Sequence, residues 1–172
     1  FSYLKYGDHT SNLISKIIYS LKNKSNDSIR YIYDNYGNIT EIRENNILIA
    51  RYRYDALSRI IREDNKIFKK TTTYVYDAGG NIIEKLEYPF TLIENLDELK
   101  VSSFNYSYNT IGWKDQVVKF KGDNFEENFE YDNIGNPKKY RGKELKWSHE
   151  KQLEKYDVTF DSNGIEQCFA KY

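Results

Sequence analysis

A short motif of the form aromatic-x-aromatic-Asx-x-x-Gly recurs six times along this chain of 172 residues, with one position changed in the second copy and one in the sixth. The copies follow one another at intervals of roughly 20 to 30 residues, which is a typical length for structural repeats. A unit this short buries too little surface to fold alone, so neighbouring copies must pack against one another. The motif therefore restricts the chain to a repeat architecture.

The copies have similar residues at corresponding positions, with Val158 and Ser58 as the two exceptions. The aromatic pairs are Tyr31 and Tyr33, Tyr52 and Tyr54, Tyr74 and Tyr76, Tyr106 and Tyr108, and Phe129 and Tyr131, with Val158 and Phe160 in the sixth copy. The Asx positions are Asp34, Asp55, Asp77, Asn109, Asp132 and Asp161. The positions three residues later are Gly37, Ser58, Gly80, Gly112, Gly135 and Gly164. We interpret the last two sets as structural turn positions.

The motif predicts a β-hairpin for physical reasons. Two aromatic residues with one residue between them lie on the same face of a strand. An Asx side chain accepts hydrogen bonds from backbone N–H groups just ahead of it. A glycine three residues later supplies the positive φ that closes a type I turn with a G1 bulge. Ser58 is the exception, so we expect a strained residue or a different turn type there.

The sequence as a whole predicts an all-β fold. Stacked antiparallel hairpins form one curved or spiral sheet over residues 1–172, with rings in ladders between neighbours. We expect an irregular unit at residues 1–28 and an insertion at residues 88–100. Leu92, Leu96 and Leu99 have helical spacing, so a short helix or a packed loop is expected near residues 91–99.

The charge balance and residue content of the chain argue against several classes of protein. The 26 basic residues balance the 26 acidic ones, which argues against a strongly basic nucleic-acid-binding protein. We find no apolar run long enough to span a membrane and no signal peptide. The absence of Met leads us to expect a fragment or a processed piece. A lone Cys168 cannot form an internal disulfide, and we expect it to be a small buried residue.

The chemistry-bearing residues favour structural roles. The spacing of the Asx and Gly positions favours turn capping over calcium binding or acid catalysis. His9 and His149 lie far apart in sequence, and we expect surface or turn positions for both. We therefore predict no catalytic residue, no metal site and no cofactor. Lys69 and Lys70, and the basic cluster at 138–141, are expected to be solvated charges.

The tyrosines have a second interpretation. Exposed aromatic rings can stack on sugars, so the repeat aromatics from Tyr31 to Tyr131 are possible glycan contacts if they are exposed. Structural ring ladders are favoured, because rings with period two on stacked hairpins bury one another. A glycan-binding adhesion module remains the alternative, and a hydrolase with clustered carboxylates is a third class.

The repeated Tyr-x-Tyr-Asp-x-x-Gly-Asn-Ile resembles the YD repeat of the RHS (rearrangement hot spot) family. The resemblance covers nearly the whole chain. The order of variants at residues 51–63, 74–82, 112–116 and 131–137 is similar to the late repeats of wall-associated RHS proteins from Gram-positive bacteria.

The resemblance implies a hollow β-shell that encloses a variable C-terminal toxin domain and helps deliver it. It implies a secreted or cell-surface bacterial protein, with neighbouring repeats of the shell, an enclosed toxin domain and cell-wall glycan as possible partners. This chain departs from the family pattern because it has few repeats, no core-end Asp-Pro-x-Gly-Leu segment and no toxin domain after Tyr172. A short array leaves open sheet edges, so we expect capping by the terminal units or self-association.

The leading prediction is a non-enzymatic structural β-scaffold, with no nucleic acid and no membrane span.

Overall fold

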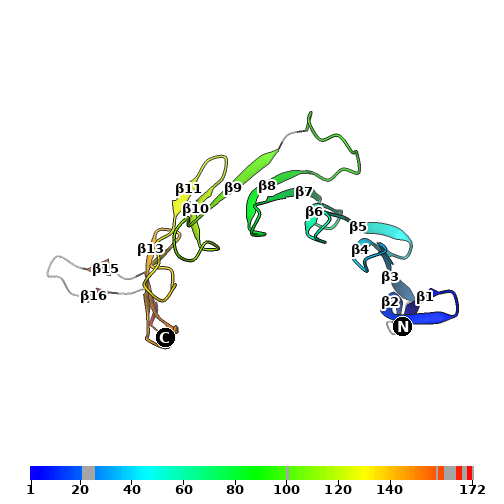
Figure 1. Ribbon diagram of the computed structural model, residues 1–172, viewed down its shortest axis with the longest axis horizontal. Helices are drawn as coiled ribbons and strands as arrows, with labels where there is room; N and C mark the ends of the chain where they lie inside the picture. The colour runs from blue at the N-terminus through cyan, green and yellow to red at the C-terminus, as the bar shows by residue number, and fades with distance from the viewer. Residues whose placement is uncertain (21–25, 100, 158, 161–165, 168–169, 172) are drawn as a thin grey trace. The chain divides into compact units, whose positions relative to one another are not determined.

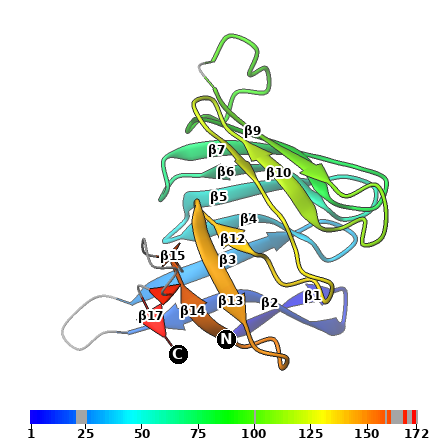
Figure 2. The ribbon, with the colours of Figure 1, turned by 90° about the vertical axis from the view of Figure 1, so that its left-hand side faces the viewer.

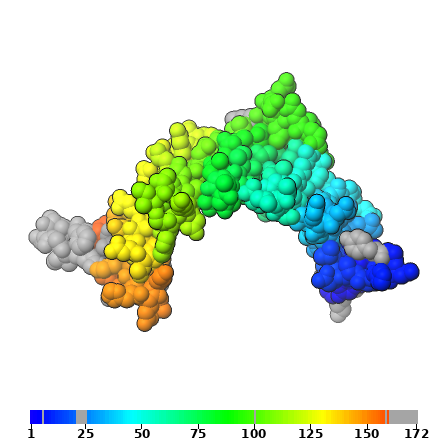
Figure 3. Space-filling model, in the orientation of Figure 1, coloured from blue at the N-terminus to red at the C-terminus, as the bar shows by residue number. Residues whose placement is uncertain are grey.

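The structure is a computed structural model that describes residues 1–20, 26–99, 101–157, 159–160, 166–167 and 170–171; the other residues are grey in Figure 3. The turn positions Asp161 and Gly164, and also Cys168, therefore lie outside the described residues.

The regular elements of the described residues are all β-strands. They are β1 (Ser2–Tyr6), β2 (His9–Tyr19), β3 (Asp27–Tyr33), β4 (Ile39–Glu44), β5 (Ile47–Tyr54), β6 (Ile60–Asn65), β7 (Lys70–Tyr76), β8 (Ile82–Pro89), β9 (Ser102–Tyr108), β10 (Val117–Lys121), β11 (Glu126–Asn128), β12 (Lys139–Tyr140), β13 (Lys143–Trp147), β14 (Leu153–Tyr156), β15 (Thr159–Phe160), β16 (Glu166–Gln167) and β17 (Ala170–Lys171).

Strands β1 to β11 form one antiparallel sheet in sequence order (Figure 1). Strands β12, β13, β14 and β17 form a second sheet, and β15 pairs with β16. The prediction of an all-β fold of antiparallel hairpins is confirmed. No helix forms between residues 91 and 99, where the chain is a loop with one turn closed by Leu99 N–H to Leu96 O (3.0 Å). The helical alternative for this segment is therefore wrong.

The chain divides into two compact units. The first comprises residues 1–77 and 84–103, and the second comprises residues 78–83 and 104–172. The expectation of a single array over residues 1–172 stays a prediction.

In the first unit, strand register places the aromatic residues on one face, which we call the tyrosine face. Tyr31 pairs with Ile42, and Ile42 pairs with Ala50. On the next strands, Tyr52 pairs with Glu63. Figure 2 shows β2 to β7 side by side in this order. Residues with the opposite parity, such as Arg51 and its partner Asp64, lie on the other face.

The interior of the described residues is unusual because it is mainly polar. Ala50 is the one buried apolar residue that they contain. The buried polar residues are Arg62, Asp64, Asn65, Thr71, Thr72 and Asn136. Each buried side-chain nitrogen and oxygen atom among the described residues has a hydrogen-bond partner. Since a single-layer sheet leaves few positions out of water, stability must come from strand pairing, half-buried rings and satisfied polar groups.

In the second unit, aromatic rings stack across strands. The ring of Phe120 on β10 stacks with the rings of Phe104 and Tyr106 on β9, with centroids 6.0 and 4.8 Å apart. Phe125 meets Phe120 edge-on at 5.0 Å. Such contacts supply about 0.5–1.5 kcal/mol each beyond the area that they bury.

Candidate functional site: the interfaces between repeats

The first repeat turn is built on Asp34. Its N–H donates to Asn38 O (2.9 Å), and Gly37 N–H donates to Asp34 O (3.2 Å). The carboxylate Oδ1 accepts the N–H groups of Tyr36 and Asn38, both at 2.9 Å. Gly37 has φ +86°, a conformation that favours glycine. This pattern is a type I turn closed by a G1 bulge.

The second turn has the same hydrogen bonds although serine replaces glycine. Ser58 N–H donates to Asp55 O (3.0 Å), and Asp55 Oδ1 accepts the N–H groups of Leu57 and Arg59 (2.9 and 3.0 Å). Ser58 has φ +59°, so it adopts the left-handed conformation that costs a side-chain-bearing residue about 1–2 kcal/mol. The turn type is therefore kept, and Ser58 carries the strain.

The remaining turns vary in detail. Asp132 repeats the bonding of Asp34, with Oδ1 accepting from Ile134 (3.0 Å) and Asn136 (2.9 Å). At Asn109 the loop is longer, because the Asn109 N–H donates to Gln116 O (2.9 Å). Positive φ angles recur at Gly80 (+93°), Gly112 (+78°) and Gly135 (+87°). Asp77 accepts a bond at its backbone oxygen from Arg59 Nη1 (3.3 Å).

Gly135 is also required for packing. A Cβ atom at this position would lie 2.0 Å from Cζ3 of the Trp113 ring. The ring of the previous repeat therefore occupies the space that a side chain would need.

The turn carboxylates have perturbed acidity. The pKa of Asp34 is lowered, first by the Asn38 side-chain amide and then by backbone N–H groups. The pKa of Asp55 is lowered, first by the Arg59 backbone N–H and also by its guanidinium. Hydrogen bonds to the charged form explain both directions. These carboxylates therefore accept hydrogen bonds within their own turns in the charged form.

A second set of hydrogen bonds joins successive repeats. In five repeats, the hydroxyl of the second aromatic residue donates to a backbone oxygen of the preceding hairpin. In four of them the acceptor residue is the first residue of that hairpin's outgoing strand, and in the first repeat it is Ile14 on β2. The pairs are Tyr33 to Ile14 (2.7 Å), Tyr54 to Ile39 (2.7 Å), Tyr76 to Ile60 (2.7 Å), Tyr108 to Ile82 (2.9 Å) and Tyr131 to Val117 (2.7 Å). We call these the tyrosine–carbonyl bonds.

The tyrosine–carbonyl bonds explain why the second aromatic residue of these repeats is tyrosine rather than phenylalanine. Phenylalanine would fill the same space, yet each of these five positions is tyrosine. The rings are half-buried, and burial raises the pKa of Tyr33, Tyr54, Tyr76 and Tyr131. The hydroxyl gives each half-buried ring a polar partner, which is the usual requirement for a buried tyrosine. The preference for Tyr over Phe is the signal that sequence reasoning could have used.

The irregular hairpin β1–β2 also accepts a tyrosine–carbonyl bond. Ile14 on β2 provides the acceptor for Tyr33, in the role that Ile39 has for Tyr54. The unit expected at residues 1–28 thus offers the first repeat a surface like that of a regular repeat.

Neighbouring turns are linked as well. The Asn38 side-chain amide donates to Ser58 Oγ (3.1 Å). The guanidinium of Arg59 lies 4.6 Å from the ring centroid of Tyr76, a cation–π distance. The residue after the Gly or Ser position therefore reaches the next repeat along the chain.

The first aromatic residues are also half-buried. Tyr31, Tyr52, Tyr74, Tyr106 and Phe129 fall in this class, and so do the second members of their pairs. The structure therefore offers none of the ten repeat aromatics as a fully exposed ring.

The loop at residues 90–99, which follows β8 within the expected insertion and is here called the insertion, lies against the face opposite the tyrosine face. Arg62 Nη2 donates to Ile93 O (2.8 Å) and Thr91 O (3.2 Å), and Arg51 Nη2 donates to Leu92 O (3.0 Å). Backbone carbonyls are thus held by two arginines from β5 and β6. The sequence did not predict this contact.

A buried carboxylate positions both arginines. Asp64 Oδ1 lies 2.7 Å from Arg62 Nε, and Oδ2 lies 2.8 Å from Arg51 Nε. Thr71 Oγ1 lies 3.0 Å from Asp64 Oδ1 and also accepts the Thr91 N–H (3.0 Å). The cluster is fully hydrogen-bonded, which is the condition for burying charge without a large penalty.

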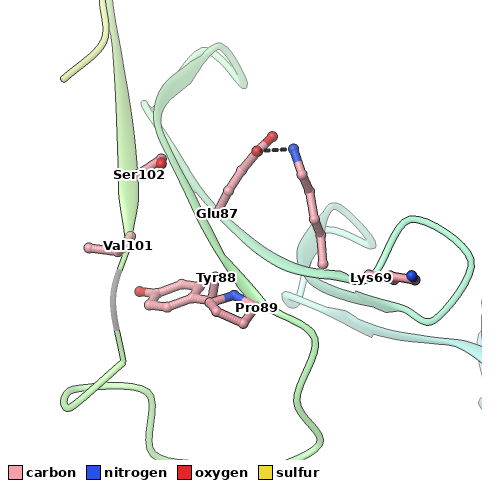
Figure 4. A pocket seen from close by; sticks show the side chains of 7 residues that line it. Lys69, Glu87, Tyr88, Pro89, Val101 and Ser102 are labelled. Atoms are coloured by element: carbon pink, nitrogen blue, oxygen red, sulfur yellow. Dashed lines mark hydrogen bonds and ion pairs between the residues drawn. The ribbon is translucent and has the colours of Figure 1, made fainter. Parts of the chain in front are cut away.

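A cavity of about 320 Å³ opens beside this region (Figure 4). It is lined by Lys69 and Lys70, by the end of β8 and by residues 101 and 102. Glu87 forms ion pairs with Lys70 and with Lys85. The cavity holds no histidine, cysteine or paired carboxylates, so its lining does not assemble a catalytic set.

The other candidate residues do not converge. His9 and His149 are both exposed. Within the described part of the chain, no three His, Cys, Asp or Glu residues are grouped so that they could hold a metal ion. The same part contains no helix of the length and apolarity needed to cross a membrane.

Comparisons with known proteins agree with this architecture. The family model of the Teneurin YD-shell matches residues 5–148. Among curated proteins, no sequence match is found.

Solved structures with a similar fold include two multi-component complexes. A Tc holotoxin pore from Photorhabdus luminescens, with a mutation in its TccC3 component, superposes with a TM-score of 0.53 at 19% identity over 82% of this chain. A TcdB2–TccC3–Cdc42 complex superposes with a TM-score of 0.51 at 13% identity over 90% of this chain. The chain spans 8% and 11% of the lengths of those two chains.

The predicted resemblance to YD repeats is confirmed, because the family match extends over most of the hairpins described above. The chain belongs to the Teneurin YD-shell family of repeat-built structural shells.

Proposed function

We propose that this chain forms a non-enzymatic section of the wall of a β-shell, in a secreted or surface-attached bacterial protein whose shell encloses a C-terminal toxin domain and helps deliver it. The main support for this proposal is the series of tyrosine–carbonyl bonds. It ties hairpins to their predecessors in the same way at five successive positions.

These bonds suit a wall that must continue over many repeats. Each uses a backbone oxygen as acceptor, so the bond does not depend on which side chain the preceding repeat carries. Tyr54, Tyr76 and Tyr108 each join the end of an incoming strand to the start of the previous outgoing strand. The side chains of such a wall can therefore differ from repeat to repeat while the tyrosine–carbonyl bonds between repeats stay the same.

The state of the carboxylates supports a non-enzymatic role. Asp34, Asp55 and Asp132 accept hydrogen bonds from their own turns and have lowered pKa values. A general acid requires a pKa raised toward neutrality, which is the opposite direction. The hydrolase hypothesis therefore has no support from these residues.

The toxin-related part of the proposal draws on the similar structures. One is a Tc holotoxin pore and the other contains TccC3 bound in a complex with TcdB2 and Cdc42. Their fold is shared with this chain over most of its length.

The decisive experiment is cryo-electron microscopy of the protein purified from its source. We expect these hairpins in the wall of a closed shell, with density for an enclosed domain that resists protease until the shell is opened. An open sheet, or a closed shell with an empty interior, would refute the enclosing role.

The glycan-binding alternative has weaker support. The repeat aromatics are half-buried, and five of their hydroxyls already donate to backbone oxygens. A glycan array would test it. Binding that is lost in Tyr31→Ala and Tyr52→Ala would favour an adhesion module over the wall.

A further inference from the structure

The turn that joins β6 to β7 presents two adjacent large apolar side chains to solvent. In this turn, residues 66–69 and here named the tip, Ile67 is 67% exposed and Phe68 is 71% exposed. Lysines flank the pair at positions 66, 69 and 70. Adjacent exposed apolar residues of this size at the end of a hairpin call for a physical explanation.

The tip is held in this conformation by hydrogen bonds to the side chain of Asn65. Asn65, which is buried, accepts the N–H groups of Ile67 (3.0 Å) and Phe68 (3.1 Å) at Oδ1. Its Nδ2 donates to Glu63 Oε1 (2.9 Å). The two apolar side chains are therefore displayed by a fixed turn.

One backbone hydrogen bond joins the insertion to the tip, and another closes the tip itself. Lys69 O accepts the N–H of Phe90 (3.0 Å), while Lys69 N–H donates to Lys66 O (3.3 Å). Lys69 has φ +53°, a conformation that costs energy for lysine. Backbone strain that is held in place by surrounding hydrogen bonds is typical of functional sites, so the exposed side chains of the tip are candidates for a function.

The charges at the tip are all positive. Lys70 forms an ion pair with Glu87, but the side chain of Lys69 points away from that pair (Figure 4). Neither Lys66 nor Lys69 forms a salt bridge with another described residue. Two unpaired cations thus stand beside two exposed apolar groups.

We propose that this tip docks on the surface of an anionic lipid bilayer. Ile67 and Phe68 enter the boundary between headgroups and acyl chains, and Lys66 and Lys69 extend their ammonium groups to the lipid phosphates. A protein partner fits less well, because lysine is depleted in the cores of protein interfaces. This surface role is independent of the shell-wall function.

Vesicle flotation tests the proposal with the full chain. The probes are vesicles of phosphatidylcholine alone and vesicles that also contain phosphatidylserine. We expect reversible binding to the anionic vesicles that weakens as salt is added. The double variant Ile67→Ser with Phe68→Ser should lose about tenfold or more in affinity. Lys66→Gln and Lys69→Gln should each lose about fivefold.

Leu57→Ser is the matched control. Leu57 is 72% exposed, and its turn lies at the opposite end of β6. Its substitution should leave vesicle binding unchanged, and circular dichroism should show that each variant keeps its β content. A Phe68→Trp variant should show a blue shift of the added tryptophan emission on anionic vesicles only.

The proposal fails if the chain ignores anionic vesicles, or if Leu57→Ser weakens binding as much as the double variant. It also fails if the double variant abolishes self-association while no lipid binding is seen, since that result would assign the tip to a second copy of the chain.

Discussion

A single oxygen atom distinguishes the second aromatic residue of each repeat from phenylalanine, and it has a defined partner. The tyrosine–carbonyl bonds lie between 2.7 and 2.9 Å, within the normal range for a hydroxyl donor. Removing such a donor takes one hydrogen bond away from the backbone oxygen of a half-buried residue. The cost should therefore exceed that of losing an exposed hydroxyl.

Tyr54→Phe tests this at one joint. The variant should lower the free energy of unfolding by about 1 kcal/mol, because the Ile39 oxygen loses its donor. Urea denaturation provides the measurement. Tyr36→Phe is the control, since Tyr36 is 88% exposed and its change should stay within about 0.5 kcal/mol. Equal losses in the two variants would mean that the bond contributes no net stability.

The turn carboxylates predict sensitivity to acid. The pKa values of Asp34 and Asp55 are lowered in the folded state by hydrogen bonds to the charged form. Their stabilisation is therefore present above the unfolded pKa, about 3.9, and is lost as pH falls through the folded pKa.

Urea midpoints measured as a function of pH should thus decline below about pH 4. In the double variant Asp34→Asn with Asp55→Asn, the amide oxygens can still accept from the backbone but do not titrate. The decline should become shallower in this variant. An unchanged acid slope would assign the sensitivity to other groups.

At the scale of the hairpin, sequence and structure agree where the determinants are local. The fixed spacing from Asp34 to Gly37 specifies both the hydrogen bonds and the positive φ of the turn, so these were predictable. The partner of the Tyr54 hydroxyl was not, because Ile39 lies fifteen positions earlier and offers only a backbone atom. Long-range contacts with backbone acceptors leave no complementary residue type in the sequence.

The insertion shows the same limit more strongly. The leucine spacing at 92, 96 and 99 favoured a helix as one option, but the carbonyl groups of residues 91–94 bind Arg51 and Arg62 instead of one another. Arginines at alternate strand positions facing Asp64 were the available signal. Their ligands lie about thirty to forty residues away, so no local pattern identifies them.

Arg62→Met tests whether these arginines hold the insertion. Removal of the buried guanidinium leaves the Asp64 carboxylate with one of its two cations, and we expect a loss of about 3 kcal/mol. Amide hydrogen exchange at Thr91, whose N–H donates to Thr71, should become faster.

Arg53→Met is the control at this element. Its ion pair with Glu94 is partly exposed, so the loss should stay below about 1 kcal/mol. If Arg62→Met leaves exchange at Thr91 unchanged, the insertion is held by its own turns rather than by the arginines.

At the scale of the whole molecule, the described residues bury little apolar surface completely. Ala50 is their one buried apolar residue, whereas six polar or charged residues are buried. The repeat aromatics contribute through half-buried faces and the tyrosine–carbonyl bonds. Stability should therefore depend more on hydrogen bonds and neighbouring-repeat contacts than on a hydrophobic core.

This balance predicts a low heat capacity of unfolding. Exposure of apolar surface raises the heat capacity and exposure of polar surface lowers it. We therefore expect a value per residue below the range of about 12–15 cal/mol/K that globular domains show. Scanning calorimetry over a series of pH values gives the quantity from the slope of enthalpy against melting temperature. The scans should be repeated at several protein concentrations, because association would bury further apolar surface. A value within the globular range at every concentration would show that this chain buries an apolar core after all.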